Sequence, residues 1–410
     1  MKSQKILNDP VYGFITIPSE LIFTIIDHPY FQRLRRIKQL GLTDFVYPGA
    51  LHTRFHHAIG AMHLMSITLD NLRIKGTEIS EEEYEASLIA ILLHDIGHGP
   101  FSHALEYSLL KGVHHEELSL LAIELLNREL GGKLALTLRI FKNQYERKFF
   151  HQLVSSQLDI DRLDYLQRDC FFTGVSEGTI GADRIIKMMD VKNDQVVIEE
   201  KGIYSIENFL SARRLMYWQV YLHKTTVSAE KMLINLINRA KILRQSGTKF
   251  VLTEEFDFFL LNELKLDDFK LNDSLLPMFL ELDDFDIWGA IKLWKNHPDY
   301  VLRNISRMFL TRNLFKINFS NEPFSREEIN QMQEKTIEKL EIPTEDIDFF
   351  FSYGTVSNYG YLAKERINIL TKKGKVIDVA QAADLPNIKV MSKIVEKHYV
   401  CKAKSVNLNY

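Results

Sequence analysis

The sequence is poor in cysteine, and this shortage removes several kinds of protein from consideration. Its 410 residues include two cysteines, Cys170 and Cys401, which lie too far apart to match a zinc site or a redox motif. Free thiols are typical of a reducing compartment. We therefore expect a cytoplasmic protein without a disulfide framework.

The chain also has little net charge and no long apolar runs. The 51 basic residues nearly balance the 54 acidic ones, so the net charge is −3 and no overall basic field attracts nucleic acid. The first residues are too polar for a signal peptide, and no apolar stretch approaches the roughly 20 residues that a membrane span needs. We expect neither a membrane nor a nucleic acid among its partners.

Hydrophobic residues, by contrast, make up 46% of the chain, which is enough for a large core. Residues 5–18 alternate apolar and turn-forming residues and predict a hairpin. Helical periodicity follows, and we predict helices from Ser19 to Gly41 and over residues 56–76. Ser80 and three glutamates predict the start of another helix, which continues as an apolar run to His94.

The pattern changes in the second half of the chain. Helices are predicted over residues 101–170 and 204–246, separated by a strand-like piece at 194–205. Residues 252–286 are acidic but carry interleaved Phe and Leu, so packed amphipathic helices are favoured over an acidic tail. Residues 344–401 mix strand candidates with loops.

These patterns predict a mainly α fold in two regions. Residues 1–246 form a helical core with an N-terminal hairpin. Residues 247–410 form a helical and α+β C-terminal region that packs on this core. Neither an internal repeat nor a low-complexity linker separates the two regions.

The stretch LLHDIGHGPFSH, residues 92–103, concentrates titratable groups at the end of an apolar helix. His94 and Asp95 are adjacent, so on a helix their side chains point about 100° apart and converge only in a concave core. Imidazole and carboxylate together suit Fe, Mn or Zn, and a carboxylate can bridge to a hard ion such as Mg. When His and Asp are adjacent and no other ligand is in view, the histidine is more often a core residue with an ordinary hydrogen bond.

Two other segments favour a metal site. His57 lies on the preceding predicted helix, with Arg54 one turn before it. Residues 155–170 carry four aspartates among apolar positions, namely Asp159, Asp161, Asp164 and Asp169. Unpaired carboxylates are costly to bury, so a metal or a cationic ligand would explain their presence. Ligands from three segments, with positions left for water, describe an open hydrolytic centre.

The order H…HD…D, together with HDIGHGPFSH, resembles that of the HD-domain phosphohydrolase superfamily. More narrowly, the chain resembles the HD-domain deoxynucleoside triphosphate triphosphohydrolases in five ordered segments, over roughly residues 5–375. The other four segments are FQRLRRIKQLG, YPGALHTRFHHAIG, DIDRLDYLQRDC and RNLFK. The resemblance implies an HD-type helical core. It also implies a divalent transition metal (Fe, Mn, Zn or Ni), with Mg on the substrate phosphates, and the metal ligands His57, His94, Asp95 and Asp161.

The resemblance further implies three catalytic histidines, His98, His103 and His115. One of them would protonate the departing 5′-oxygen of the nucleoside, a task that suits an imidazole titrating near neutrality. We expect this residue to be His103, oriented by Glu106 one turn later. His115 has an alternative interpretation, because the sequence HHEE would also suit an exposed helix start.

Contacts to the phosphates and the sugar are implied at five positions. Arg54, Arg162 and Arg213 match residues that contact phosphate. Tyr165 and Asp169 match residues that contact the deoxyribose. There the ring of Tyr165 would exclude a 2′-hydroxyl group, and Asp169 would accept a hydrogen bond from the 3′-hydroxyl.

The base-contacting positions are matched less well. Gln39 agrees with the family pattern. Tyr217 and Leu222, however, stand where the relatives carry polar residues. The resemblance therefore leaves the preferred base open.

A regulatory nucleotide site is matched in part. Asp27 and Arg35 match guanine-reading positions, and six cations match phosphate-contacting ones: Lys5, Arg184, Lys201, Arg312, Lys316 and Lys372. Glu199 stands where an arginine is expected and would repel one phosphate. The resemblance thus implies a homo-oligomer, a dimer or a tetramer, activated by GTP or a dNTP. The alternative is that these are dispersed surface charges.

We therefore expect metal-dependent hydrolysis of dNTPs to deoxynucleoside and inorganic triphosphate. A second interpretation keeps the metal chemistry but assigns another nucleotide or phosphoester as the substrate. A third is a nucleotide-sensing or nucleic-acid-binding scaffold without turnover. The complete set of four ligands and the lack of a basic stripe disfavour the third.

Overall fold

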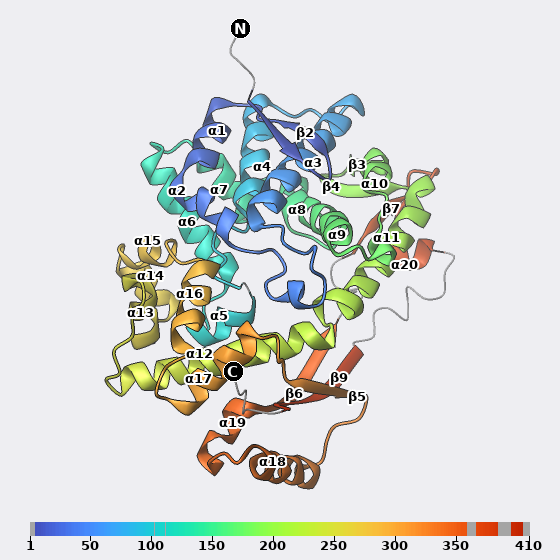
Figure 1. Ribbon diagram of the computed structural model, residues 1–410. Helices are drawn as coiled ribbons and strands as arrows, with labels where there is room; N and C mark the ends of the chain where they lie inside the picture. Colours follow the sequence, from blue (N-terminus) through green and yellow to red (C-terminus); the bar gives the residue numbers. More distant parts are fainter. Residues whose placement is uncertain (1–4, 102, 111, 359–365, 384–394, 405–410) are drawn as a thin grey trace.

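The computed structural model describes residues 5–101, 103–110, 112–358, 366–383 and 395–404. Helices dominate and the strands are short, which confirms the mainly α fold (Figure 1). No helix within these ranges combines the length and the apolar character that crossing a membrane requires.

Three helices form the centre of the molecule, where α3 (Arg54–Ile74) packs against both α4 (Glu81–Leu93) and α9 (Ile160–Thr173). The last two turns of α4 are buried on every side, because its residues there are all apolar. The helices around this centre are α6 (His115–Glu129), α7 (Ala135–Phe141), α8 (Lys148–Val154), α10 (Ala182–Met188) and α11 (Ile203–Met216).

The start of α4 is fixed by a capping box, as the sequence predicts. The hydroxyl of Ser80 accepts from the backbone N–H of Glu83 at 3.2 Å, and the Glu83 carboxylate accepts from the N–H of Ser80 at 2.8 Å. Glu81 and Glu82 add negative charge to the first turn. The helix then ends at Leu93, which places the adjacent His and Asp at its C-terminal end.

The single helix predicted from Ser19 to Gly41 is wrong. The structure has α1 (Glu20–Asp27), α2 (Pro29–Gln32) and a 3₁₀ turn over Arg33–Arg36. His28 between them is extended, with φ −64° and ψ 137°. A residue before proline is pushed out of the helical region, and Pro29 has no N–H to continue the ladder, so the helix breaks there.

The long helix α12 (Lys224–Gln245) runs across the molecule below the central helices and carries the C-terminal region (Figure 1). It packs against α5 (His103–Leu109) on one side and against α13 (Glu254–Leu261) and α17 (Tyr300–Leu310) on the other. The acidic stretch 252–286 forms packed helices, as predicted, with buried phenylalanines at its centre. The remaining helices here are α14 (Leu266–Leu271), α15 (Leu275–Phe279), α16 (Asp284–Trp294), α18 (Arg326–Leu340), α19 (Ile347–Phe350) and α20 (Val379–Ala382).

Three small sheets complete the fold. The predicted N-terminal hairpin is confirmed as β1 (Ile6–Asp9) paired with β2 (Gly13–Thr16). The other sheets have the strand orders β3-β4-β7-β8 and β5-β9-β6. Their strands are β3 (Met189–Lys192), β4 (Gln195–Glu199), β7 (Asn368–Leu370), β8 (Val376–Asp378), β5 (Lys316–Ser320), β6 (Phe351–Asn358) and β9 (Val395–Lys402).

The sequence patterns miss β3 and β5 and make β4 too long. The predicted strand at 194–205 ends at Glu199, and α11 begins at Ile203. Strand β5 pairs with β9, about 80 residues further along the chain, so its local sequence carries little of the signal that stabilises it.

A junction between the two regions holds the loop that follows α4. The buried guanidinium of Arg33 donates to the carbonyls of Ile96 at 3.2 Å, His98 at 2.6 Å and Leu282 at 2.6 Å. The buried carboxylate of Asp284 accepts from the N–H groups of Lys38 at 2.9 Å and Phe101 at 2.7 Å. Residues 282–284 of the C-terminal region therefore position the glycine-rich loop. We call this the 282–284 junction.

Candidate metal centre and substrate cleft

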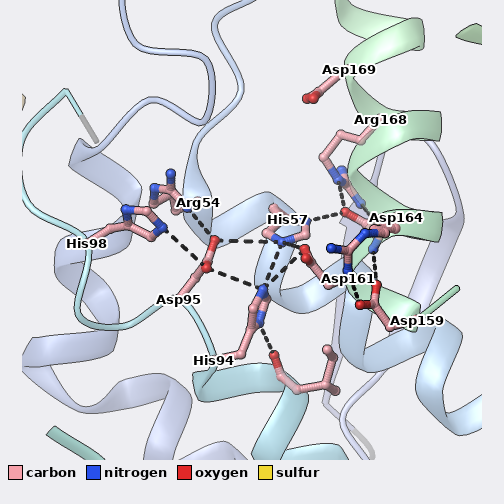
Figure 2. Close-up of polar contacts among 12 residues, drawn as sticks. Arg54, His57, His94, Asp95, His98, Asp159, Asp161, Asp164, Arg168 and Asp169 are labelled. Carbon is pink, nitrogen blue, oxygen red and sulfur yellow. Dashed lines mark hydrogen bonds and ion pairs between the residues drawn. The ribbon is translucent and has the colours of Figure 1, made fainter. Parts of the chain in front are cut away.

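Four side chains from three central helices converge at one point. The start of α3 supplies His57, the end of α4 supplies His94 and Asp95, and the first turn of α9 supplies Asp161. Figure 2 shows the two imidazoles and two carboxylates pointing toward one another. His57 Nε2 lies 3.0 Å from Asp161 Oδ1 and 3.8 Å from Asp95 Oδ2. The structure thus brings together all four ligands that the sequence implies.

The spacing of these atoms fits one metal ion. His94 Nε2 lies 3.3 Å from His57 Nε2, 3.3 Å from Asp161 Oδ1 and 3.4 Å from Asp95 Oδ1. Ligand atoms that are each about 2.1 Å from a shared ion lie about 3.0 Å apart at right angles and about 3.4 Å apart at tetrahedral angles. Two imidazoles and two carboxylates are a donor set for a divalent transition metal.

The Nδ1 atoms of His57 and His94 already have hydrogen-bond partners. His57 Nδ1 lies 2.7 Å from Asp164 Oδ2, and His94 Nδ1 lies 2.6 Å from the carbonyl oxygen of Ile91. Each contact holds a proton on Nδ1 and leaves Nε2 as the metal ligand. Asp164, a carboxylate noted in the sequence, is therefore not a ligand. It orients one.

Asp164 is itself held by a buried network. Arg168 donates to both of its oxygens, at 3.0 Å each, and also to Asp9 at 2.7 Å. Burial would raise the pKa of Asp164, but Arg168 and His57 outweigh it and bring the pKa to about 2. Gly60 makes room for this network, since a Cβ there would lie 2.0 Å from Arg168 Nη2. Arg168 was not identified from the sequence: Asp164 lies one turn before it on α9, but Asp9, its other partner, lies on the distant strand β1.

The carboxylates also control the charge of the two imidazoles in the metal-free protein. Burial opposes a charged imidazole, but hydrogen bonds to Asp161 and Asp164 outweigh it and raise the pKa of His57 to about 10. Burial also opposes a charged His94, but the charges of Asp95 and Asp161 outweigh it and raise the pKa of His94. The metal-free centre therefore holds protons at neutral pH.

Metal affinity is expected to increase with pH from about 6.5 to 9. A metal must displace the protons from His57 and His94, and each proton released makes binding about tenfold tighter per pH unit below the pKa of the group that releases it. Chelator competition with Mn²⁺ or Zn²⁺ at several pH values measures this slope, and calorimetry in two buffers counts the protons. Replacing Asp164 by Asn lowers the His57 pKa and should flatten the slope. An affinity independent of pH would contradict the proposed ligand set.

A cleft of about 550 Å³ opens beside this centre, a size suited to a small-molecule ligand. It is lined by most of the residues to which the family pattern gives a substrate role: Gln39, Arg54, Asp95, His98, His115, Asp161, Arg162, Tyr165, Asp169 and Tyr217. The end of the cleft at the metal centre is rich in charge, whereas Tyr217, Tyr221 and Leu222 line an aromatic and apolar part.

Three arginines lie near the charged end. Arg54 contacts Asp95, and Arg162 contacts Asp159 and the carbonyl of Ser156. Arg213 is buried close enough to Tyr165 for its charge to lower the pKa of that phenol, although burial dominates and raises it. The Nε and Nη1 atoms of Arg213 have no hydrogen-bond partner among the described residues. Buried donors of this kind call for an acceptor such as a phosphate oxygen.

Two of the implied catalytic histidines form a stack. The rings of His98 and His115 lie 3.8 Å apart at 18°. Burial, together with the charge of Arg54, holds the pKa of His98 well below its ordinary value, so its ring is neutral at pH 7. His115 Nδ1 lies 3.1 Å from Glu106 Oε1. His103 begins α5, but its side chain lies outside the described part of the structure. The structure therefore shows Glu106 orienting His115.

Asp169, the aspartate implied at the sugar, is held by two residues that the sequence analysis did not identify. Asp169 is buried, and its oxygens lie 2.7 Å from His52 Nε2 and 2.8 Å from the hydroxyl of Tyr221. His52 also stacks on Phe172, with ring centroids 4.5 Å apart. Each carboxylate oxygen keeps a second lone pair, so Asp169 can still accept a further hydrogen bond.

The implied effector residues lie in three separate places on one chain. Lys5, Asp27 and Arg35 belong to the N-terminal hairpin and α1–α2 region, and Arg312 and Lys316 lie around the start of β5. Arg184, Lys201 and Lys372 gather near β4: Arg184 donates to the Lys201 carbonyl at 3.3 Å, and the Lys372 N–H donates to Glu200 at 2.6 Å.

Glu199 is paired in the structure. Its carboxylate lies 2.6 Å from Lys75 Nζ and 2.8 Å from Lys201 Nζ. Hydrogen bonds from these two ammonium groups lower the pKa of Glu199. The repulsion that the sequence analysis expects from this residue is therefore offset by Lys75, which that analysis did not consider.

Comparisons with known proteins agree with this geometry. The family model for the HD domain matches residues 54–169, which include all four ligands, and a model for the HD associated region matches residues 180–264. The chain is similar to a solved phosphohydrolase from Bacteroides thetaiotaomicron, with 50% identity, a TM-score of 0.94, and coverage of 98% of this chain and 100% of the other.

Curated relatives include proteins with and without an assigned activity. The uncharacterized protein YwfO of Bacillus subtilis is 36% identical, over 77% of this chain and 72% of its own length. The deoxynucleoside triphosphate triphosphohydrolase SAMHD1 homolog of Dictyostelium discoideum is 31% identical, over 77% of this chain and 60% of its own length. Human deoxynucleoside triphosphate triphosphohydrolase SAMHD1 is 27% identical, over 82% of this chain and 58% of its own length.

Proposed function

The chain belongs to the HD-domain phosphohydrolases, and from this membership we propose that it hydrolyses dNTPs to deoxynucleoside and inorganic triphosphate. The observation that carries the proposal is the single cleft in which Asp161, Arg162, Tyr165 and Asp169 succeed one another along α9. A metal ligand, a phosphate-binding cation, a sugar-stacking ring and a hydroxyl acceptor then lie in the order in which a dNTP presents its parts.

We propose that His57, His94, Asp95 and Asp161 hold a divalent transition metal, with Mg on the substrate phosphates. Such a metal, when bound, supplies an activated water and polarises the phosphorus. The donor set and the spacing reported above fit one ion. A second set, Asp95, His98 and His115, also has ligand atoms close enough for a cation beside it.

The arginines bind and orient the substrate. A dNTP carries about four negative charges, so cations must surround its phosphates. Arg54 and Arg162 line the cleft, and Arg213 offers two buried donors that have no acceptor among the described residues. These groups neutralise the triphosphate and place the α-phosphorus at the metal centre.

His115 supplies the proton to the leaving group in this proposal. As a water oxygen bonds to the α-phosphorus, the bond from phosphorus to the 5′-oxygen breaks and its electron pair passes to that oxygen. In this step the His115 ring carries two protons: Nδ1–H donates to Glu106, and Nε2–H gives its proton to the departing oxygen. His98 is neutral and buried against the same ring, which keeps His115 in place.

At the sugar, Asp169 accepts from the 3′-hydroxyl and the ring of Tyr165 excludes a 2′-hydroxyl. His52 and Tyr221 fix the carboxylate for this contact. Selectivity for deoxyribose thus follows from one hydrogen bond and one steric contact.

We further propose that the protein is a homo-oligomer activated by GTP or a dNTP. The gathering of Arg184, Lys201 and Lys372 near β4 supports a phosphate site there. Lys75 and Lys201 offset the charge of Glu199 at that place, which removes one objection to an anionic effector.

Product analysis tests the proposed activity. Each dNTP is incubated alone and in pairs with Mn²⁺ or Mg²⁺, with and without GTP, and the products are separated by ion-exchange chromatography. We expect deoxynucleoside and triphosphate in equal amounts, with no orthophosphate. Release of orthophosphate or of a nucleoside diphosphate would assign the centre to another phosphoester reaction. A rate that appears only in mixtures would establish activation.

A further inference from the structure

Three polar groups of the cleft lining have no hydrogen-bond or ion-pair partner among the described residues. Gln39 Oε1 and Thr226 Oγ1 are buried and have no hydrogen-bond partner within the described ranges. Glu230 lines the same cleft, and no ion pair or hydrogen bond joins its carboxylate to a described residue. Buried polar groups are normally paired, so the two buried oxygens beside the half-buried Glu230 carboxylate indicate a ligand that supplies the missing bonds.

Two segments that pack against each other carry these groups. Thr226 and Glu230 are four residues apart and so share one face of α12. The turn Thr43–Phe45 packs against this helix, and Gln39 lies just before it on the cleft wall. Tyr217 and Leu222 line the same cleft. A flat apolar ring bound there would lie between these side chains with its polar edge toward α12.

All three groups can accept hydrogen bonds. A carboxylate offers only acceptors, and the amide oxygen and the hydroxyl can act as acceptors as well. The nearest cation in the sequence, Lys231, is engaged elsewhere, with its Nζ 5.6 Å from the centre of the Tyr399 ring. Burial raises the pKa of Glu230 to about 7, because the ionised carboxylate is destabilised there. A pair of hydrogen-bond donors would offset this destabilisation.

We propose that Gln39, Thr226 and Glu230 form a base-reading wall that selects a purine with adjacent N–H donors, namely guanine. This inference rests on the proposed function and names the nucleotide class that the site prefers. Guanine presents N1–H and an N2 amino group side by side, and the two oxygens of one carboxylate accept both. Adenine and cytosine set an acceptor nitrogen beside their amino group, and it would face a Glu230 oxygen. Thymine offers one N–H between two carbonyls.

Deoxyinosine triphosphate is the sharpest probe of this wall, because it differs from dGTP by the loss of the N2 amino group alone. We expect kcat/KM of the wild type to fall in the order dGTP, dITP, dATP, by about tenfold at each step. Replacing Glu230 by Gln should lower kcat/KM for dGTP by about 10- to 100-fold, mostly through KM, and change that for dATP by less than about threefold. Lys231→Gln, a change of charge in the same turn of α12 outside the cleft, should leave the order intact.

Equilibrium binding makes the inference independent of turnover. Titration of the wild type and Glu230→Gln with dGTP and dATP, followed by calorimetry, should show a preference for dGTP that the variant loses. The variant removes a buried acid, so its thermal midpoint should equal or exceed that of the wild type. Equal losses for all nucleotides, or no preference in wild-type binding, would overturn the base-reading wall. Absence of hydrolysis with the binding preference intact would refute the proposed reaction alone.

Discussion

The His94→Ala variant is expected to lose the bound metal and to turn over dNTPs at least about a thousandfold more slowly than the wild type. His94 lies 3.3–3.4 Å from a ligand atom of each of the other three metal-binding residues, so its removal opens the centre on the side of α4. The remaining Asp95 and Asp161 carboxylates then face each other with less positive charge to separate them. Elemental analysis of the purified protein and initial rates at saturating substrate measure the two effects.

His398→Ala is the matched control for this variant. His398 lies on β9 in the three-stranded sheet, half-buried and paired with the hydroxyl of Thr355 at 3.1 Å. It has no place in the cleft, so metal content and rate should both match the wild type. If His94→Ala kept one equivalent of metal and its activity while folded, the proposed centre would be wrong.

The Arg213→Ala variant is expected to lower kcat/KM for a dNTP by about 10²- to 10⁴-fold, mainly through a higher KM. Two buried donors of this guanidinium have no acceptor among the described residues, and hydrogen bonds to charged groups contribute about 1.5–3 kcal/mol each. Losing two such bonds to the triphosphate accounts for the expected range. Substitution by Lys should restore part of the effect, since it keeps the charge but not the fork of donors.

Arg214→Ala provides the comparison for Arg213. The two arginines are neighbours in the last turn of α11, but Arg214 is half-exposed, whereas Arg213 is buried near Tyr165. Its removal should leave kcat/KM within about twofold. The thermal midpoint of Arg213→Ala should not fall, because the free protein loses a cation that is buried without a full set of partners. Equal kinetic effects from both substitutions would show that Arg213 acts only through the overall charge.

The metal centre could be predicted because several of its ligands stand out in the local sequence pattern. His94 and Asp95 end a helix whose start, at Ser80, obeys a capping rule, and Asp161 sits among apolar residues where a carboxylate is out of place. Such signals need no knowledge of distant contacts. The resemblance to the HD-domain proteins then selected Asp161 from the four aspartates of residues 155–170 and gave the complete ligand set.

The residues that support the site could not be predicted in the same way. Asp169 is held by His52, which lies 117 positions earlier, and His57 is oriented by Asp164, which lies 107 positions later. The sequence predicts a contact from Glu106 to His103, one turn away, but it does not predict the contact to His115, which depends on how α5 meets α6. Pairings of this kind follow from tertiary packing, which periodicity does not encode.

The same holds for the acceptors that read the base. Thr226 and Glu230 look like ordinary positions of an amphipathic helix, and Glu230 would pass for a solvated charge. Only the burial of α12 against the turn at residues 43–45 turns that face toward a cleft. A departure from the family pattern at Tyr217 and Leu222 marked the region as unusual without showing what replaces the missing contacts.

The 282–284 junction has a consequence for how relatives of this chain can diverge. Arg33 fastens the histidine-bearing loop to a backbone carbonyl far along the polypeptide, and Asp284 fastens the other end of that loop. A chimaera that takes its C-terminal half from another family member would therefore lose these hydrogen bonds unless the residues at positions 33, 282 and 284 come from the same parent. Across the family these sites should change in concert, and the C-terminal half should be as slow to drift there as the ligands themselves.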